Sequence, residues 1–167
     1  GNKLLLCGNG GSCADCEHIA GELVKSFYRD RPLDTELAEK LGPDLATNLH
    51  GSLPAIPLAS FTAFHTAFSN DDHPEYAFAQ QVVGLGKPGD ALLAISTSGN
   101  SANILHAAKT AHAMGLQVIG LTGESGGKLA PLCDVAVCAP ETDVARIQEF
   151  HLQIYHAFCE MIEEAMF

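Results

Sequence analysis

The sequence predicts an α/β fold: a doubly wound, three-layer arrangement with helices on both faces of a five-stranded parallel sheet. Two observations predict it. Short, nearly continuous apolar runs bounded by Gly, Pro, Asp or Ser recur along the 167 residues, which is typical of strands buried on both faces. Helical patterns lie between these runs, and such alternation gives parallel strands joined by right-handed crossovers.

The elements follow in order along the chain. The first strand is KLLLC, and the helix behind it opens at a glycine-rich turn. Gly115 follows the third helical pattern as a C-cap, directly before the fourth strand. The expected strands are residues 3–7, 55–60, 91–96, 117–122 and 135–139. The expected helices are residues 12–27, 74–86, 101–114 and 143–166.

Residues 30–54 interrupt this rhythm. Three prolines and two glycines frame a short helical piece near residues 35–41. We interpret the segment as an ordered excursion over the surface of a single domain that spans residues 1–167. A plain connector and a lid or pocket wall are both open interpretations of it.

The composition excludes several classes of protein. Hydrophobic residues make up 47 % of the chain, which argues against disorder. The net charge of −11, with 20 acidic residues against nine Lys and Arg, argues against a nucleic-acid partner. No apolar run is long enough to span a bilayer and no secretory signal pattern opens the chain, so we expect a cytoplasmic protein without a membrane partner.

The six cysteines are expected to be reduced thiols, mostly small core residues. Cys13 and Cys16 form a C-x-x-C pair, but no second pair follows at metal-site spacing, so the pair is a weak signal for structural zinc. A redox role for the pair is disfavoured because thioredoxin-like proteins place this motif in a different βαβ context.

Two loops are suited to hold a phosphate. Residues 8–12 (GNGGS) and 96–101 (STSGNS) each follow a predicted strand and open a predicted helix. Ligands of open parallel sheets bind outside the carboxyl ends of the strands, where helix N-termini favour an anion. Glycines allow close approach of the backbone and hydroxyls add donors. Ordinary turn and cap chemistry would explain one such loop, but two at the same sheet edge favour an anionic ligand.

Known nucleotide-binding and hydrolase motifs are absent or incomplete in the sequence. The dinucleotide fingerprint G-x-G-x-x-G fails at Cys13, and no Walker A pattern occurs. Residues 123–127 match G-x-S-x-G, and Asp143 and His151 follow in the order of a hydrolase triad. However, the segment behind this motif is broken by Pro131 and is too short for the helix that a nucleophile elbow requires, so a serine hydrolase is disfavoured.

Residues suited to acid–base or metal chemistry occur on two predicted helices. His18 and Glu22 are four residues apart and share one face of the first helix. The last helix carries Gln148, His151, Tyr155 and His156. An exposed helix face and a core histidine at position 151 are the plain alternatives, and spacing alone does not bring the two helices together. Imidazole and carboxylate suit Zn²⁺, and a carboxylate beside a phosphosugar can abstract a proton next to a carbonyl, as in aldose–ketose isomerisation.

Several segments together resemble the phosphoheptose isomerases, a branch of the sugar isomerase (SIS) fold. They are CGNGGSCADCEHIAGEL, FSNDD, ISTSGNSANIL, LTGESGGKLAPLCDV and ARIQEFHLQIYH, and the resemblance runs from residue 3 almost to the C-terminus except across 30–54. It implies conversion of D-sedoheptulose 7-phosphate to D-glycero-D-manno-heptose 7-phosphate for bacterial surface polysaccharide such as lipopolysaccharide. It also implies a homotetramer with sites at subunit interfaces and one zinc ion per subunit.

The resemblance implies a role for each matching residue. Glu22 corresponds to the catalytic base and His156 to the acid that completes proton transfer. The zinc ligands correspond to His18, Glu22, Gln148 and His156. Glu22 and Gln148 also correspond to substrate contacts of the family. The other substrate contacts correspond to Asn9, Gly10, Gly11, Asn70, Asp71, Ser96, Thr97, Ser98 and Ser101.

The sequence also departs from the family pattern. The N-terminal helix of the family is absent from this sequence, and the 30–54 segment is longer than in the members compared. Where many members carry an arginine four residues after the base, this chain has Ser26, so that Lys25, Arg29 or Arg31 is expected to take its place. Two non-catalytic alternatives stay open: a scaffold of the same fold that binds the replication initiator DnaA, and a domain that senses sugar phosphates without turnover.

Overall fold

The computed structural model describes residues 1–167 and contains one five-stranded sheet. All neighbouring strands are parallel, in the order β2-β1-β3-β4-β5. The strands are β1 (Leu4–Cys7), β2 (Ala55–Pro57), β3 (Ala91–Ser96), β4 (Gln117–Thr122) and β5 (Val135–Cys138). The predicted fold class is therefore confirmed.

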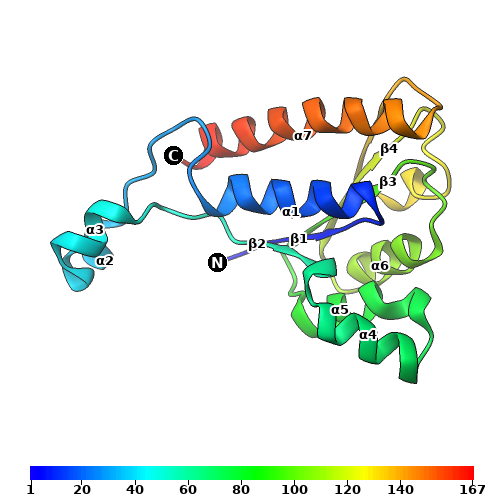
Figure 1. Ribbon diagram of the computed structural model, residues 1–167, viewed down its shortest axis with the longest axis horizontal. Helices are drawn as coiled ribbons and strands as arrows, with labels where there is room; N and C mark the ends of the chain where they lie inside the picture. Colours follow the sequence, from blue (N-terminus) through cyan, green and yellow to red (C-terminus); the bar gives the residue numbers. More distant parts are fainter.

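Helices cover both faces of the sheet (Figure 1). Helices α1 (Gly11–Val24) and α7 (Val144–Met166) lie side by side on one face. The opposite face is covered by α5 (Ala77–Leu85) and α6 (Ala102–Ala113), and α4 (Thr62–Asp71) packs beside α5. None of the helices is both long enough and apolar enough to cross a membrane.

The sheet has a separate apolar core on each face. Leu5 and Leu92 pack on the side of α5 and α6, whereas their neighbours Leu6 and Leu93 pack on the side of α1 and α7. All four are buried, and burying such a side chain contributes about 1.5–3 kcal/mol. Successive strand residues point to opposite faces, so burial on both sides explains why the strands read as continuous apolar runs.

The strand order creates a switch point between β1 and β3. The chain leaves β1 toward β2 on one side and later returns to β3 on the other side, so the two following connections diverge. Binding crevices of open α/β sheets form at such a point. Both predicted phosphate loops lie there, because one follows β1 and the other follows β3.

The helix boundaries differ from prediction at several places. The first helix ends at Val24 rather than at residue 27, because Lys25 is extended and the Arg31 guanidinium donates to the carbonyls of Glu22 and Leu23. Those carbonyls belong to the last turn, where no further helical N–H reaches them. Residues 58–60 continue β2 as a 3₁₀ turn instead of strand, and α4 was not predicted at all.

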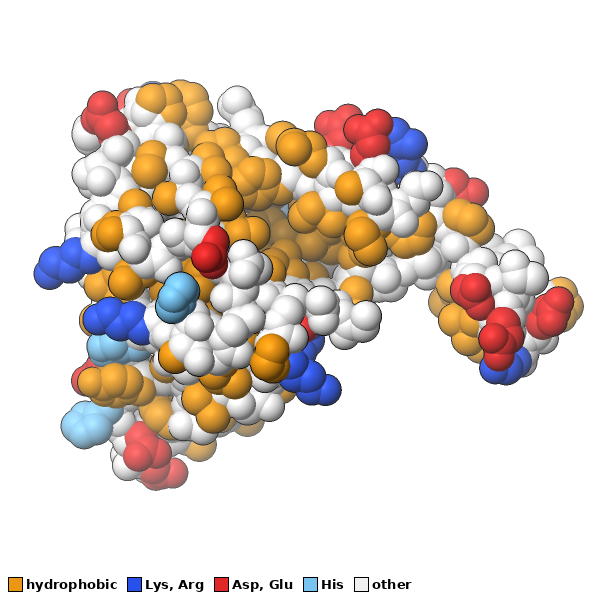
Figure 2. Space-filling model, turned by 180° about the vertical axis from the view of Figure 1, so that it is seen from behind, with side chains coloured by type: hydrophobic (Ala, Val, Ile, Leu, Met, Phe, Trp, Pro, Cys, Tyr) orange, Lys and Arg blue, Asp and Glu red, His pale blue; other side chains and the backbone are white.

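The excursion forms two short helices. The predicted piece at Thr35–Leu41 is helix α2, and α3 (Pro43–Asn48) follows after Gly42. Neither helix buries a residue. The pair projects from the end of α1 and α7 that lies away from the glycine-rich loop, and Figure 2 shows it as a lobe set apart from the body of the molecule.

Helices α1 and α7 run in the same direction with a fixed register. Gly11 lies against Gln148 at their N-terminal ends, and His18 contacts Tyr155 near their middle. Beyond the end of α1, Phe27 donates its N–H to Glu163. Residues about 137 positions apart in the sequence therefore face each other along the whole contact.

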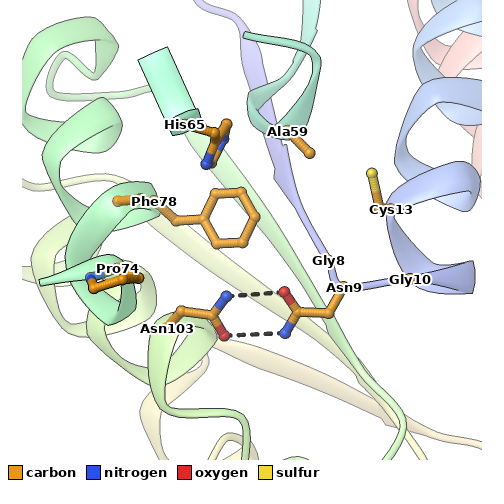
Figure 3. Close-up of a pocket in the computed structure, with 10 residues that line it drawn as sticks. Gly8, Asn9, Gly10, Cys13, Ala59, His65, Pro74, Phe78 and Asn103 are labelled. Atoms are coloured by element: carbon orange, nitrogen blue, oxygen red, sulfur yellow. Dashed lines mark hydrogen bonds between the residues drawn. The ribbon is translucent and has the colours of Figure 1, made fainter. Parts of the chain in front are cut away.

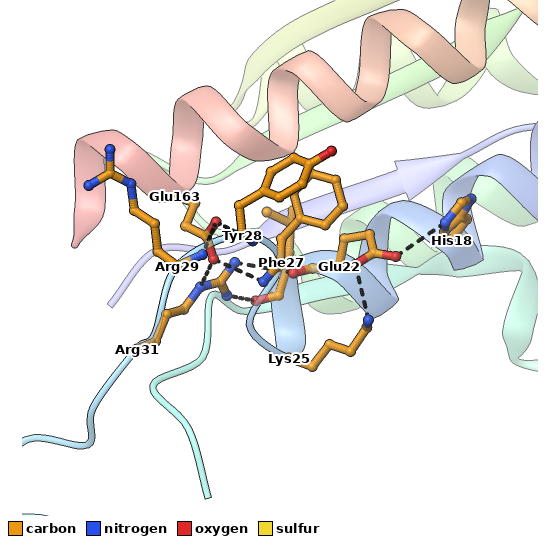
Figure 4. Close-up of polar contacts among 9 residues, drawn as sticks. His18, Glu22, Lys25, Phe27, Tyr28, Arg29, Arg31 and Glu163 are labelled. Carbon is orange, nitrogen blue, oxygen red and sulfur yellow. Dashed lines mark hydrogen bonds and ion pairs between the residues drawn. The ribbon is translucent and has the colours of Figure 1, made fainter.

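A buried ion pair fixes the C-terminal end of this contact (Figure 4). Arg31 Nε lies 2.7 Å from Glu163 Oε1, and both side chains are fully enclosed. Glu163 also accepts the backbone N–H groups of Phe27, Tyr28 and Arg29. Burial alone would raise the pKa of Glu163, but these hydrogen bonds and Arg31 outweigh it and lower the pKa from 4.5 to about 2.

We expect Glu163→Gln to destabilise the fold strongly at neutral pH. Removing one partner from a buried pair costs about 3–5 kcal/mol because the other charge is left uncompensated. Urea unfolding at pH 7 measures this loss. Glu164→Gln is the matched control, since Glu164 forms an exposed pair with Arg29 and should cost less than about 1 kcal/mol.

The lowered pKa of Glu163 predicts that the stability of the fold depends on pH. Because its pKa in the folded state is depressed, its contribution is present above the ordinary value of 4.5 and is lost as the pH falls toward about 2. Glu163→Gln should therefore remove part of the acid destabilisation that the unchanged protein shows. Equal acid sensitivity in both proteins would contradict the assignment.

Candidate active site

The two predicted phosphate loops enclose one cavity of about 270 Å³. The first loop lines it with Asn9, Gly10, Gly11 and Ser12, and the second with Ser96, Thr97 and Ser101. Ser96 Oγ lies 3.2 Å from Ser101 Oγ, so the hydroxyls of the second loop are already grouped. Gln148 of α7 closes the cavity.

The cavity is suited to an anion although no basic side chain lines it. It lies at the N-termini of α1 and α6, whose caps are Gly10 and Ser101. Gly10 has no side chain, and the Ser101 side chain makes no cap hydrogen bond to its own helix, so helix N–H groups remain available at both ends. The partial positive charge of two helix ends and four hydroxyl side chains favour a phosphate here over a neutral group.

Three residues that were expected to contact the substrate do not line this cavity. Ser98 lines the neighbouring cavity, and its Oγ accepts the N–H of Asn100 at 3.2 Å. Asn70 and Asp71 end helix α4, where their side chains bond to each other at 2.8 Å. Asn70 lines an open groove that does not include either loop.

A second cavity of about 240 Å³ lies on the other side of the glycine-rich loop (Figure 3). Asn9 and Asn103 join their amides across its floor by two hydrogen bonds of 3.0 and 2.8 Å. His65 and Phe78 form the opposite wall. This cavity shares Asn9 with the first one and His65 with the groove beside Asn70, so the three hollows adjoin along one edge. Sequence reasoning missed Asn103, although its place two residues after Ser101 in a predicted helix start was a usable signal.

His18, Glu22 and His156 come together between α1 and α7. His18 Nε2 lies 3.2 Å from Glu22 Oε1, and the rings of His18 and His156 are 5.1 Å apart between centroids. The Glu22 side chain is 11 % exposed. Sequence spacing alone did not place α1 and α7 next to each other. In the structure the two helices meet at these residues.

Lys25 is the cation that reaches this cluster (Figure 4). Its Nζ lies 3.2 Å from Glu22 Oε2. Of the other two candidates for the missing arginine, Arg29 pairs with Glu164 on the surface and Arg31 is enclosed with Glu163. Of these three candidates only Lys25 lies beside Glu22, and its side chain is 65 % exposed.

The cluster holds buried polar atoms that lack hydrogen-bond partners. They include Glu22 Oε2, His156 Nε2 and Asp15 Oδ2. The ion pair with Lys25 compensates the charge of Glu22 without forming a hydrogen bond of good geometry. Such atoms cost free energy unless a ligand or ion binds them, so their concentration here indicates a binding site.

The donors in this cluster fit zinc in part. The 3.2 Å between His18 Nε2 and Glu22 Oε1 suits two ligands that share one tetrahedral ion at bonds of about 2.0–2.2 Å. His156 offers a third, unpartnered nitrogen nearby. The chain does not by itself bring three such side chains to metal-binding distances. Gln148 lies eight residues before His156, about 12 Å of helical rise away, against the glycine-rich loop.

Comparisons with known proteins agree with this architecture. The chain matches the SIS domain family over residues 1–123. It is 45 % identical to the phosphoheptose isomerase of Roseiflexus sp. (strain RS-1) and 43 % identical to that of Aneurinibacillus thermoaerophilus, covering all of this chain and 75 % of each relative. The chain belongs to the phosphoheptose isomerase family of SIS domain proteins.

Solved structures of this family have the same fold. The phosphoheptose isomerase of Neisseria gonorrhoeae superposes with a TM-score of 0.79 at 39 % identity, over 98 % of this chain and 77 % of that one. The enzyme of Francisella tularensis gives 0.81 at 36 % identity over the same shares. The resemblance derived from the motifs is therefore confirmed.

Gly11→Ala should weaken anion binding without unfolding the protein. A Cβ at Gly11 would overlap the amide of Gln148, the flexible end of a long side chain, and would push it out of the cavity wall. We expect the affinity for inorganic phosphate to fall about tenfold, the effect of losing about one hydrogen bond to a charged ligand. Calorimetric titration measures it.

Gly21→Ala on the same helix is the matched control. A Cβ there meets nothing within 4 Å, so the substitution should stabilise the helix by about 0.5–1 kcal/mol and leave phosphate binding unchanged. Unaltered phosphate affinity in Gly11→Ala would contradict the role of this contact.

Proposed function

We propose that the protein is a phosphosugar isomerase that converts D-sedoheptulose 7-phosphate to D-glycero-D-manno-heptose 7-phosphate, for bacterial surface polysaccharide such as lipopolysaccharide. One observation carries the proposal: the same two helices place a hydroxyl-and-glycine anion cavity at their N-terminal ends and a carboxylate beside two imidazoles further along. The names of the relatives agree with it.

The proposed reaction moves one proton between adjacent carbons. Glu22 removes a proton from C1 of the ketose, which gives an enediol intermediate, and returns it to C2 to form the aldose. His156 moves the accompanying proton between the two oxygens. The reaction is redox-balanced within the substrate, because C1 is oxidised as C2 is reduced. The loops at residues 8–12 and 96–101 hold the phosphate at the other end of the sugar.

The distance between the anion cavity and the pair of His18 and Glu22 favours a long substrate. The helical rise from Gly11 to His18 is about 10 Å, and Glu22 points its carboxylate back to His18. A seven-carbon phosphosugar reaches further from its phosphate than a six-carbon one, so the spacing supports the heptose. Fructose 6-phosphate is the natural control substrate.

We also propose one zinc ion per subunit, held by His18 and Glu22, with His156 as the next donor and Gln148 of this or a neighbouring subunit as a fourth. The ion would polarise the oxygens of the enediol. A homotetramer with sites at subunit interfaces is part of the proposal. Exposed apolar side chains on the outer face of α1 and α7 support it, and they are Val24, Phe150, Leu152, Met161 and Ile162.

The non-catalytic alternatives are less well supported. A scaffold that binds DnaA or a sensing domain needs the fold and the loops but has no use for a carboxylate and an imidazole brought together between two helices. Glu22 and His156 are both present and close to the same ring, that of His18. The relatives found are named as isomerases.

Glu22→Gln should abolish turnover of sedoheptulose 7-phosphate. The substitution removes the proposed proton abstractor and weakens one proposed zinc ligand while keeping the size of the side chain, so we expect activity to fall below detection while binding of the sugar stays within about tenfold. A coupled or chromatographic assay of heptose formation and a calorimetric titration measure the two quantities. Glu160→Gln on the exposed side of α7 is the control and should behave as the unchanged protein.

Two outcomes would contradict the assignment. Turnover that survives in Glu22→Gln would assign the base to another residue. Absence of turnover in the unchanged protein, with binding retained, would instead favour the sensing domain.

The purified protein should contain about one zinc ion per chain, and a chelator should suppress turnover. His18→Ala should lower the zinc content, measured by atomic emission, because it removes one of two donors at 3.2 Å. Full activity in demonstrably zinc-free protein would restrict these residues to acid–base and binding roles.

A further inference from the structure

One pair of side-chain amides joins the two anion loops (Figure 3). Asn9 lies in the glycine-rich loop, and Asn103 lies in the first turn of α6, two residues after Ser101. Asn9 Nδ2 donates to Asn103 Oδ1 at 3.0 Å, and Asn103 Nδ2 donates to Asn9 Oδ1 at 2.8 Å. The contact therefore links the segment after β1 to the segment after β3, 94 positions further along the chain.

This pair supplies the only hydrogen bonds between the two loops. The pairing of β1 with β3 ends at Cys7 and Ala94, before either loop begins. Beyond that point, residues 8–12 and 96–103 exchange no hydrogen bonds other than the two between the amides. A phosphate in the cavity of about 270 Å³ has to contact both loops at once, because each loop lines part of it. The amide pair therefore fixes the gap that an anion must fit.

A backbone N–H group fixes the orientation of both amides. The N–H of Ile104 donates to Asn103 Oδ1 at 3.0 Å. Because a backbone N–H can only donate, the amide atom that faces it is the oxygen, and the NH₂ group of Asn103 then faces Asn9 Oδ1. The Asn9 amide keeps one N–H that Asn103 does not use. Since Asn9 lines the anion cavity, this N–H is the amide donor that it can offer a ligand.

The pair also lies between two cavities. Asn9 lines both the anion cavity and the cavity of about 240 Å³ in Figure 3, whereas Asn103 lines only the second. Without the Asn103 amide, the Asn9 side chain would be free to turn into either cavity. An anion would then have to order Asn9 and its loop on binding, which costs affinity that the paired structure retains.

We propose that Asn103 is a positioning residue of the anion site: its amide ties the glycine-rich loop to the start of α6 and thereby sets both the gap between the two anion loops and the orientation of the Asn9 amide. Asn103 acts through Asn9 and does not itself line the anion cavity. The inference rests on the phosphate site of the proposed function and adds a residue on which the grip on phosphate depends.

The test compares Asn103→Ala, Asn9→Ala and the double variant by calorimetric titration with inorganic phosphate. In Asn103→Ala the affinity should fall about tenfold, since the loop and the Asn9 side chain must be ordered on binding. The double variant should bind phosphate as weakly as Asn9→Ala and no more weakly, because Asn103 has no other route to the anion.

The control is Asn48→Ala, which removes an amide that donates to Asp44 O in α3 and should leave phosphate affinity unchanged. Alanine favours a helix more than asparagine does, so Asn103→Ala should keep the fold, which thermal unfolding checks. Asn103→Ser replaces it if needed, since a serine side chain is too short to join both atoms of the Asn9 amide.

Turnover of sedoheptulose 7-phosphate gives a second readout. In Asn103→Ala the KM should rise about tenfold while kcat stays within about threefold, because the hold on the phosphate is the same before and during proton transfer. A merely structural role would lower the amount of folded protein, and hence kcat, and would leave KM unchanged.

The outcomes separate the positioning role from the isomerase. Unchanged phosphate affinity in Asn103→Ala, or losses that add up in the double variant, would overturn the positioning role whatever the turnover. Absence of turnover in the unchanged protein, with phosphate losses that do not add up, would overturn the proposed function and leave the positioning role standing.

Discussion

The register between α1 and α7 is the constraint on which the rest of the site depends. The two helices run in the same direction on one face of the sheet, and the buried pair of Arg31 and Glu163 holds them at their C-terminal end. At the other end Gly11 lets the backbone of α1 approach Gln148. Everything between these two contacts is positioned by them: a slip of one residue would rotate His18 by about 100° around its helix, away from Tyr155.

Stability and binding chemistry are separated along this contact. Glu163 is surrounded by four hydrogen-bond donors, which lower its pKa to about 2 despite its burial. Glu22, which lies between the two ends of the contact, retains a buried oxygen without a hydrogen bond, and the nearby His156 retains a buried ring nitrogen without one. Charged groups whose hydrogen bonds are all made, such as Glu163, rigidify the packing of α1 against α7. Polar groups without partners, such as Glu22, lie where a substrate or cation can bind them. The lobe formed by α2 and α3 starts and ends beside this rigid end of the contact, since Arg31 O accepts the N–H of Gly51.

The strand order supplies the second half of the site. Because β1 lies between β2 and β3, the connections after β1 and β3 diverge and leave a crevice at the sheet edge. Two helix N-termini and a group of hydroxyls can hold a phosphate there without any lysine or arginine. In a chain with a net charge of −11, an anion site built from backbone N–H groups is local and does not rely on the overall field. In the proposed reaction, proton transfer takes place further along the same pair of helices, within reach of the sugar whose phosphate the loops hold.

The sequence by itself determined the fold class, the five strands and both anion loops, because burial on two faces and glycine-rich turns are local properties of the residues. It also placed His18 with Glu22, since four residues make one helical turn. It did not give helix α4, a short helix that buries nothing completely, nor the end of α1, which is set by Arg31 seven residues downstream of Val24. Only the tertiary structure decided that His156 reaches His18, that Gln148 lies at the anion cavity, and that the Tyr155 hydroxyl contacts the imidazole of His18. These contacts join residues more than 130 positions apart, and they follow from how two helices pack on a sheet, which no local pattern encodes.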